Sequence, residues 1–158
     1  MNNDKKQQFT LRIAQANSTE LIVILYEMVL CYLSDAKEHC INRDEAEFQE
    51  ALRKTRSCIQ ELLASVKIEH ELADNLNHLY WFAIRRLAQC QFQHDEGLLN
   101  QLQSMFMQLH DSYVVVAQMD SSAPIMNHTQ EVYVGLTYGK NTLAENRTNS
   151  SGNRGFCA

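Results

Sequence analysis

The chain has 158 residues, 45% of them hydrophobic, and a formal net charge of −5. This length is enough for one domain with a substantial buried core. The negative charge argues against nucleic acid binding, which needs clustered basic side chains to displace counterions.

Residues 1–96 contain neither glycine nor proline; the first glycine is Gly97 and the single proline is Pro124. Tight β-hairpins need positive φ, usually from glycine or asparagine, so this run argues against hairpin-rich β folds. It also excludes a glycine-rich phosphate-binding loop from the same stretch. The sequence therefore predicts helices joined by short polar connections.

Residues 1–16 form a mostly polar N-terminal arm, for which a loose segment and a short helix are both open. Asn17 and Glu20 then match a capping box, in which each side chain accepts a hydrogen bond from the other residue's backbone N–H. A first long helix is expected to begin there and to continue to about Cys40.

Three further helices are expected. Asp44 and Glu47 repeat the capping signal, a third helix begins near Glu69, and residues 93–95 make the next turn. In each helix apolar residues recur at steps of three and four, which is the pattern of a bundle seam. The predicted seams are Phe48, Leu52, Thr55, Ile59, Leu62 and Val66; Leu72, Leu76, Leu79, Ala83, Leu87 and Cys90; and Leu98, Leu102, Met105, Leu109 and Tyr113.

The predicted fold is therefore all-α, an antiparallel up-down four-helix bundle over residues 17–118. Residues 119–158 are expected to be a linker and a mostly flexible C-terminal tail. Within this tail, residues 130–143 (QEVYVGLTYGKNTL) are apolar enough to dock on the bundle.

No catalytic or metal-binding pattern accompanies these helices. The five cysteines show no CxxC spacing, and no Glu is followed three residues later by His, as a di-metal carboxylate centre would require. The longest apolar run is too short for a bilayer, and the N-terminus lacks the apolar stretch of a secretory signal. We expect a cytoplasmic protein that is not an enzyme, has no cofactor or metal, and does not insert into membranes.

Three stretches carry more apolar side chains than one bundle face can bury. Residues 21–33 are interrupted only by Glu27, and residues 79–82 (LYWF) and 113–116 (YVVV) are apolar throughout. Either the arm and the tail cover this surplus, or it forms a groove for the amphipathic helix of a partner. The three stretches together favour a binding protein over an enzyme.

Three segments resemble the FliS family of flagellin export chaperones. Residues 16–27 (ANSTELIVILYE) resemble the family pattern A-S-P-x-x-L-[LI]-x-x-L-Y-[DE] at the start of its first helix. Residues 75–80 (NLNHLY), followed by Arg86 and Leu87, are similar to its N-L-x-x-L-Y and R-L motif. Residues 58–62 (CIQEL) resemble its I-I-x-x-L segment, and the similarity covers about residues 9–118.

The resemblance implies a cytoplasmic chaperone that binds the C-terminal helical segment of flagellin, prevents premature polymerisation and aids secretion. It also implies contacts with the gate component of the export apparatus and with other flagellar regulators, for a monomer or weak homodimer. The apolar anchors expected for the client are Leu21, Leu25, Tyr26, Val29 and Leu33 on the first helix and Leu76, Tyr80 and Ile84 on the third.

Two other functions remain open at this stage: a self-associating regulatory or adaptor bundle, and a bundle that binds a ligand or a metal. A further hypothesis is self-regulation, in which the arm or the tail covers the groove until a client displaces it. Both contain apolar residues and are tethered to a bundle with spare apolar surface. If the tail covers the groove, deleting residues 120–158 should raise the affinity for flagellin.

Overall fold

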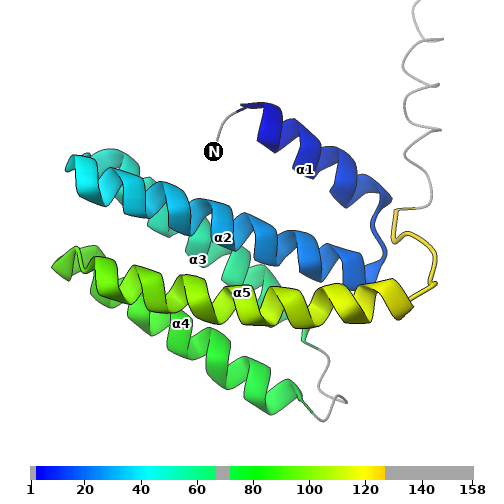
Figure 1. The fold of residues 1–158 in the computed structure, drawn as a ribbon. Helices are drawn as coiled ribbons and strands as arrows, with labels where there is room; N and C mark the ends of the chain where they lie inside the picture. Colours follow the sequence, from blue (N-terminus) through cyan, green and yellow to red (C-terminus); the bar gives the residue numbers. More distant parts are fainter. Residues whose placement is uncertain (1–2, 67–71, 127–158) are drawn as a thin grey trace, which may run out of the picture. The chain divides into compact units, whose positions relative to one another are not determined.

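The structure is a computed structural model that describes residues 3–66 and 72–126 of the chain. Its described part consists of five α-helices and contains no strand (Figure 1), which confirms the predicted all-α fold. The helices are α1 (Asn3–Gln15), α2 (Ser18–Asn42), α3 (Glu45–Ser65), α4 (Ala73–Gln93) and α5 (Glu96–Met119). Residues 1–126 form one compact unit.

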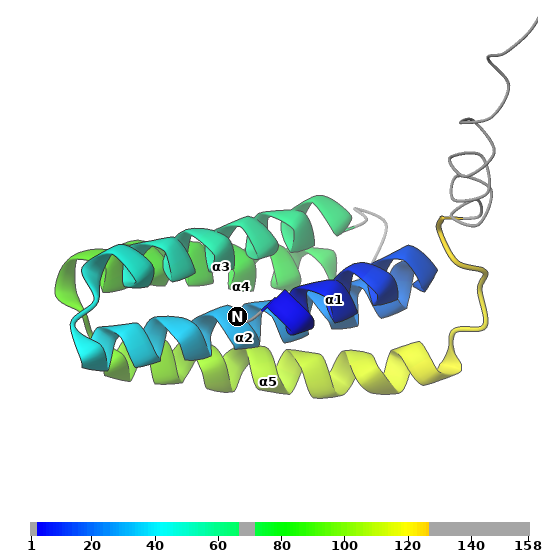
Figure 2. The same ribbon diagram turned by 90° about the horizontal axis from the view of Figure 1, so that it is seen from above.

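Helices α2 to α5 make a bundle in which α2 packs on α3 and α5, and α4 packs on the same two helices (Figures 1 and 2). At one end, the Cys40 thiol in the last turn of α2 lies 3.4 Å from the carbonyl oxygen of His94, just after α4. At the other end, Thr19 at the start of α2 contacts Asp120, just after α5. Successive helices therefore run in opposite directions, in agreement with the predicted up-and-down order.

Side-chain caps define where α2, α3 and α5 begin. The Asn17 side chain accepts the Glu20 N–H at 2.8 Å and the Glu20 carboxylate accepts the Asn17 N–H at 2.9 Å, so the predicted capping box is present. Asp44 accepts the Glu47 N–H at the start of α3, and Asp95 caps α5. These caps satisfy backbone donors that a helix leaves unpaired at its N-terminus.

The connection from α2 to α3 and the connection from α4 to α5 lie at the same end of the bundle, and both turn without glycine. Arg43 and His94 have φ of 57° and 51°, in the left-handed region that residues with a side chain seldom adopt. His94 is held there by its contacts: Nε2 lies 2.6 Å from a carboxylate oxygen of Glu45, and the imidazole stacks on Phe48 with ring centroids 4.9 Å apart.

The core lies between α2, α3, α4 and α5 and contains 20 buried residues from the part of the chain that the structure describes. The predicted seam of α3 is confirmed from Phe48 to Leu62, where all of its positions are buried. Its last predicted position, Val66, follows the helix and is only partly buried. The predicted seam of α4 was wrong at its start: Leu72 precedes the helix and is 57% exposed, and the buried residue of the second turn is Tyr80 rather than Leu79. The inward face of α4 is formed by Ala73, Tyr80, Ala83, Leu87 and Cys90.

The N-terminal arm is helical from Asn3 to Gln15 and packs on α2. The Arg12 guanidinium makes two hydrogen bonds to the Glu27 carboxylate on α2, one of them 2.8 Å long. Helix α2 thus has neighbours on three sides, α1, α3 and α5, which explains why its sequence is apolar almost all round. Part of the apolar surplus of residues 21–33 is therefore covered by the arm.

Helix α5 extends to Met119, and Asp120–Met126 follow it without helical structure. The expected start of the third bundle helix near Glu69 and the docking segment at residues 130–143 both lie outside the described residues. The predicted C-terminal tail therefore stays a prediction.

Candidate partner-binding groove

The buried core does not extend along the whole of α5. The buried residues of this helix are Leu98, Leu99, Leu102 and Phe106, and none follows Phe106. Tyr113 is only partly buried, and Val115 and Val116 are each 51% exposed. The bundle is therefore less completely filled at the end where α5 finishes.

A groove with a cavity volume of about 480 Å³ occupies that end. The start of α2, the end of α3, the start of α4 and the end of α5 form its walls, together with one residue that follows α5. Its lining is mostly apolar and consists of Ser18, Thr19, Leu21, Ile22, Leu25, Ala64, Ser65, Val66, Leu76, Tyr80, Tyr113, Val116 and Ile125.

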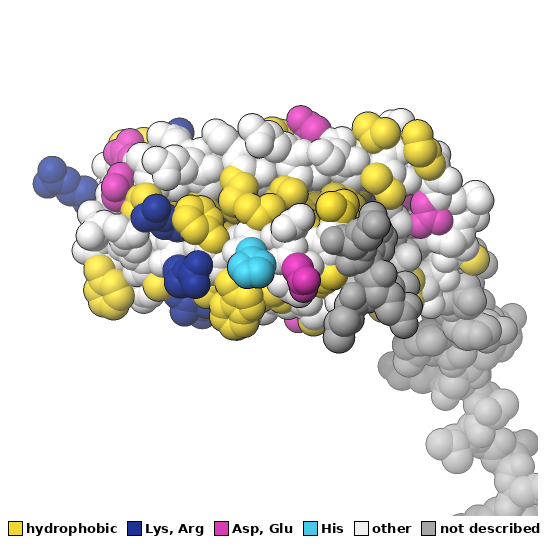
Figure 3. Space-filling model, turned by 90° about the horizontal axis from the view of Figure 1, so that it is seen from below, with side chains coloured by type: hydrophobic (Ala, Val, Ile, Leu, Met, Phe, Trp, Pro, Cys, Tyr) yellow, Lys and Arg dark blue, Asp and Glu magenta, His cyan; other side chains and the backbone are white. Residues whose placement is uncertain are grey.

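The face of the bundle seen from the side of α4 is rich in exposed apolar groups (Figure 3). Figure 3 shows hydrophobic side chains gathered along this face, with a histidine, Lys or Arg side chains and an acidic side chain among them. Trp81, Phe82 and Phe92 of α4 are exposed by 55%, 38% and 82%. Residues 79–82 therefore leave apolar side chains exposed on α4, as their sequence predicts.

Tyr80, which lines the groove, contacts Tyr26 in the core. The hydroxyl oxygens of Tyr26 and Tyr80 are 2.5 Å apart, and the Tyr26 ring packs against Phe106 and edge-on against Tyr113. Burial raises the pKa of Tyr80 to about 12, although the hydrogen bond with Tyr26 opposes this rise. Burial, with the adjacent Tyr80 hydroxyl, also raises the pKa of Tyr26. Both phenols therefore stay protonated at neutral pH.

The residues predicted to bind a partner fall into three groups. Leu21, Leu25, Leu76 and Tyr80 line the groove, although Leu25 and Tyr80 are also buried in the core, with 9% and 1% of their surface exposed. Tyr26, Val29 and Leu33 are at most 1% exposed and fill the core, because their spacing of three and four places them on the inward face of α2. Ile84 is partly buried against the core and does not line the groove.

Sequence reasoning missed several lining residues. Tyr113 and Val116 belong to a stretch already noted for its apolar surplus, and extending that argument to the groove would have found them. Val66 was assigned to the α3 seam, but it follows the last turn and lines the groove. No sequence signal pointed to Ile125, since a short segment beyond a helix carries no periodicity.

The connecting segment, residues 120–126, is attached to the start of α2. The Asn17 side-chain amide lies within hydrogen-bond range of the carbonyl oxygens of Asp120 and Ser122, at 3.4 and 3.5 Å. The Thr19 hydroxyl donates to the Asp120 carboxylate, and this bond, with those from Ser122, lowers the pKa of Asp120. The Ile125 N–H donates to the Ala16 carbonyl oxygen at 3.0 Å.

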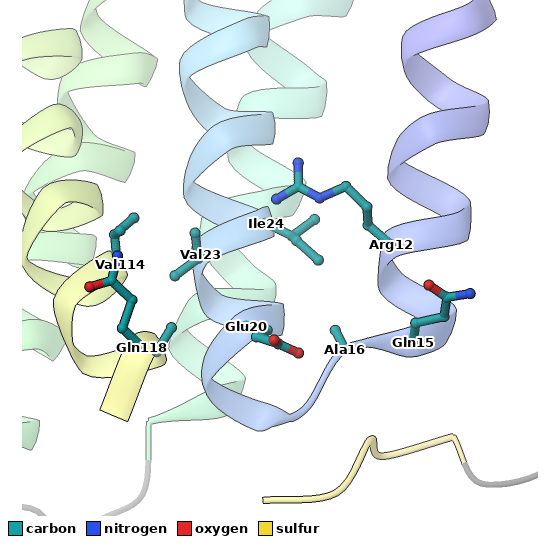
Figure 4. Close-up of a pocket in the computed structure, with 9 residues that line it drawn as sticks. Arg12, Gln15, Ala16, Glu20, Val23, Ile24, Val114 and Gln118 are labelled. Atoms are coloured by element: carbon teal, nitrogen blue, oxygen red, sulfur yellow. The ribbon is translucent and has the colours of Figure 1, made fainter. Parts of the chain in front are cut away.

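A second hollow, of about 460 Å³, lies between α1, α2 and α5 (Figure 4). Val23 and Ile24 of α2 form its apolar side, and Arg12, Glu20 and Gln118 bring polar groups to it. This hollow is more polar than the groove and is partly formed by α1 itself. The groove is therefore the better surface for an apolar helix.

The described residues offer little for other kinds of site. Among them, no three or more His, Cys, Asp or Glu side chains are placed to hold a metal ion. The four cysteines that the structure describes are free thiols, and burial raises the pKa of Cys58 and of Cys90 to about 11. Within the described ranges, no helix is long and apolar enough to span a membrane.

Residues 1–120 match the family described as "Flagellar protein FliS". The chain belongs to the FliS family. It is also 27% identical, over 105 residues, to the flagellar secretion chaperone FliS of Bacillus subtilis strain 168. That alignment covers 66% of this chain and 79% of the relative. The matched residues include all five helices and therefore the whole groove except Ile125.

Proposed function

We propose that this chain is a flagellar export chaperone that binds the C-terminal helical segment of flagellin in the groove. Membership of the FliS family supports the chaperone role, and the relative is itself named a flagellar secretion chaperone. The observation that carries the proposal is an apolar groove of about 480 Å³ where the core of a FliS-family bundle stops short.

The physical mechanism is capture of an amphipathic helix by a complementary apolar surface. Each large apolar side chain that leaves water gains roughly 1.5–3 kcal/mol, and part of this gain offsets the entropy lost when the client becomes ordered. Leu21, Leu25, Leu76 and Tyr80 are the proposed anchors from the original set, joined by Tyr113 and Val116. A client held in this way cannot use the same apolar face to polymerise.

Further partners follow from the family resemblance. We propose that the loaded chaperone also contacts the gate component of the export apparatus and other flagellar regulators in the cytoplasm. The exposed aromatic side chains of α4, Trp81, Phe82 and Phe92, are available to such a second partner while the groove is filled.

The direct test is a titration with a fluorescently labelled peptide of the C-terminal flagellin segment, followed by anisotropy. Val116 lines the groove and Val115 does not, yet both valines are 51% exposed and adjacent on α5. Val116→Glu should weaken binding at least about tenfold, because a buried carboxylate opposes the apolar contact. Val115→Glu is the matched control and should bind like the unmodified chain. Equal affinities for the two variants would remove the groove from the proposal.

The alternative is a self-associating regulatory or adaptor bundle, and the exposed aromatic residues of α4 are the observation in its favour. Light scattering separates the two functions. A monomer or weak dimer that binds the peptide supports the chaperone, whereas a tight oligomer that Phe92→Glu dissociates supports self-association.

A further inference from the structure

A hollow between α3 and α4 contains an arginine with an unpaired nitrogen. The hollow has a volume of about 310 Å³ and is lined by residues of α3 and, on α4, by Gln91. Nε of Arg56, one of the lining residues, is buried and has no hydrogen-bond partner among the described residues. Buried polar atoms are nearly always paired, and a charged group that is left unpaired is costly. The chain on its own therefore lacks an acceptor for Arg56.

The carboxylates nearest to this hollow are already bound by other groups. Arg53 makes two hydrogen bonds to the Glu50 carboxylate, 2.6 and 2.7 Å long, and the Lys54 ammonium lies 3.2 Å from it. The bonds from Arg53, and then from Lys54, lower the pKa of Glu50 to about 2, so this carboxylate stays ionised. Glu45 accepts a hydrogen bond from the Gln49 amide. The hollow thus keeps a surplus of positive charge.

The surface of α4 beside the hollow is aromatic and basic. Trp81, Arg85 and Phe92 follow one another at steps of four and seven, so they form one stripe along the helix. Ala88 lies within this stripe and is three residues before Gln91, so the stripe runs alongside the hollow. All three stripe residues are exposed, and Arg85 forms no ion pair or hydrogen bond with a described residue. Figure 3 shows Lys or Arg side chains among the hydrophobic ones on this face.

These groups together fit an acidic amphipathic helix. A carboxylate matches the planar guanidinium, with which it can form two parallel hydrogen bonds, and apolar side chains at steps of three and four match an aromatic stripe. From Trp81 to Phe92 the stripe rises roughly 16 Å, which is about three turns of a partner helix. Asp74 is the one acidic residue of α4 and lies roughly 16 Å along the helix from Arg85, too far to neutralise it. A nucleic acid does not fit, because the chain as a whole carries a net charge of −5.

We propose that the outer surface of α3 and α4 binds an acidic amphipathic helix of a second protein. One Asp or Glu of this helix pairs with Arg56 in the hollow, and its apolar residues cover Trp81 and Phe92. The Arg56 side chain as a whole is only partly buried, so its guanidinium can turn towards the carboxylate. A second copy of this chain is disfavoured, because a two-fold contact here brings arginine against arginine. The inference goes beyond the proposed function, since it does not require the groove to hold flagellin.

The test uses a display library of randomised amphipathic helices, selected for binding to the full chain. Excess soluble Arg56→Met competes during the selection and removes peptides that bind elsewhere, including those that bind in the groove. The peptides that remain should carry Asp or Glu at one fixed position among apolar residues. Replacing this residue by Asn or Gln should weaken binding to the unmodified chain about tenfold in anisotropy titrations. The same replacement should have no further effect on binding to Arg56→Met.

Lys37→Met is the matched control, because it removes one positive charge from α2, which does not line the hollow. This variant should bind the selected peptides like the unmodified chain. Arg56→Met should keep its melting temperature, since it removes a donor that has no partner. A lower melting temperature would mean that Arg56 is structural, and it would overturn the inference.

Three further outcomes would also overturn it: a selection that yields no peptide, selected peptides without a fixed acidic residue, and a homodimer in light scattering that Arg56→Met dissociates. The last outcome would make a second copy the partner. Failure of the flagellin peptide to bind the groove overturns the proposed function alone and leaves this inference in place.

Discussion

Asn17 joins the start of α2 to the connecting segment through one buried polar side chain. It is 4% exposed, caps α2 by accepting the Glu20 N–H, and points its amide at the carbonyl oxygens of Asp120 and Ser122. A buried polar group is tolerated only when it is hydrogen-bonded, and Asn17 meets this condition on both of its functional atoms. The start of α2 and the connecting segment therefore depend on the same residue.

We expect Asn17→Ala to lower the free energy of unfolding by about 1–2 kcal/mol, since a good N-cap is lost and two carbonyls lose their donor. Asp44→Ala is the control: Asp44 is an exposed cap whose bond to Glu47 is 3.4 Å long, so its removal should cost less. Urea denaturation measures both. A larger loss for Asp44→Ala would contradict the role assigned to Asn17.

Individual site residues could be predicted from the sequence only in part. Leu25 and Tyr26 are adjacent in the same motif and both contribute to the core, yet only Leu25 also lines the groove. A rotation of 100° per residue separates their directions, but the sequence does not state which direction points inward. That depends on where α3, α4 and α5 lie around α2, which is information from the tertiary structure.

At the scale of the elements, prediction succeeded where local chemistry decides the outcome. The predicted capping signals at Asn17 and Asp44 mark helix starts that the structure confirms, and Asp95, predicted only as part of a turn, caps α5. The arm could not be decided in the same way, because an isolated helix of 13 residues is marginal in water. Helix α1 depends on α2, and the pair between Arg12 and Glu27 cannot be inferred from either segment alone.

The connecting segment gives the hypothesis of self-regulation a sharper form. Ile125 lines the groove, so a client must share that wall with it or displace it. We expect a chain that ends at Met119 to bind the flagellin peptide several-fold more tightly than one that ends at Met126, because Ile125 no longer competes. Calorimetric titration of both truncated chains measures the difference. Equal affinities would mean that Ile125 does not restrict the groove.

The same segment should respond to acid. Hydrogen bonds lower the pKa of Asp120 from its ordinary value of 3.8, so the folded chain binds this proton less readily than the unfolded chain. The contribution of Asp120 is therefore present above pH 3.8 and is lost as the pH falls below it. The protection of the Ile125 amide against hydrogen exchange should therefore decrease over that range. In a Thr19→Val variant this protection should already be lower at neutral pH, and it should change less with acid.

The whole molecule should lose stability in alkali. Burial raises the pKa of Cys58 and Cys90 from 9.0 to about 11, and that of Tyr80 from 10.0 to about 12. Above pH 9 the unfolded chain releases these protons while the folded chain retains them. Stability is thus complete below pH 9 and falls as the pH rises towards 12. A series of melting temperatures from pH 7 to pH 11 measures the decline.

A variant with Cys58→Ala and Cys90→Ala provides the control for this decline. It should be less stable than the unmodified chain at pH 7, because two buried side chains become smaller. Its melting temperature should nevertheless fall less steeply between pH 9 and pH 11. Parallel curves for the two proteins would show that the thiols do not cause the alkaline loss.

The early end of the core along α5 also bears on which side chains the molecule can accept. Since no residue after Phe106 is buried and Leu109 and Tyr113 are only partly buried against the core, a substitution in the last turns of α5 should disturb the bundle less than one before Phe106. The groove wall that α5 contributes can therefore differ in sequence while the core stays the same, so the preference for a client can change without loss of the fold.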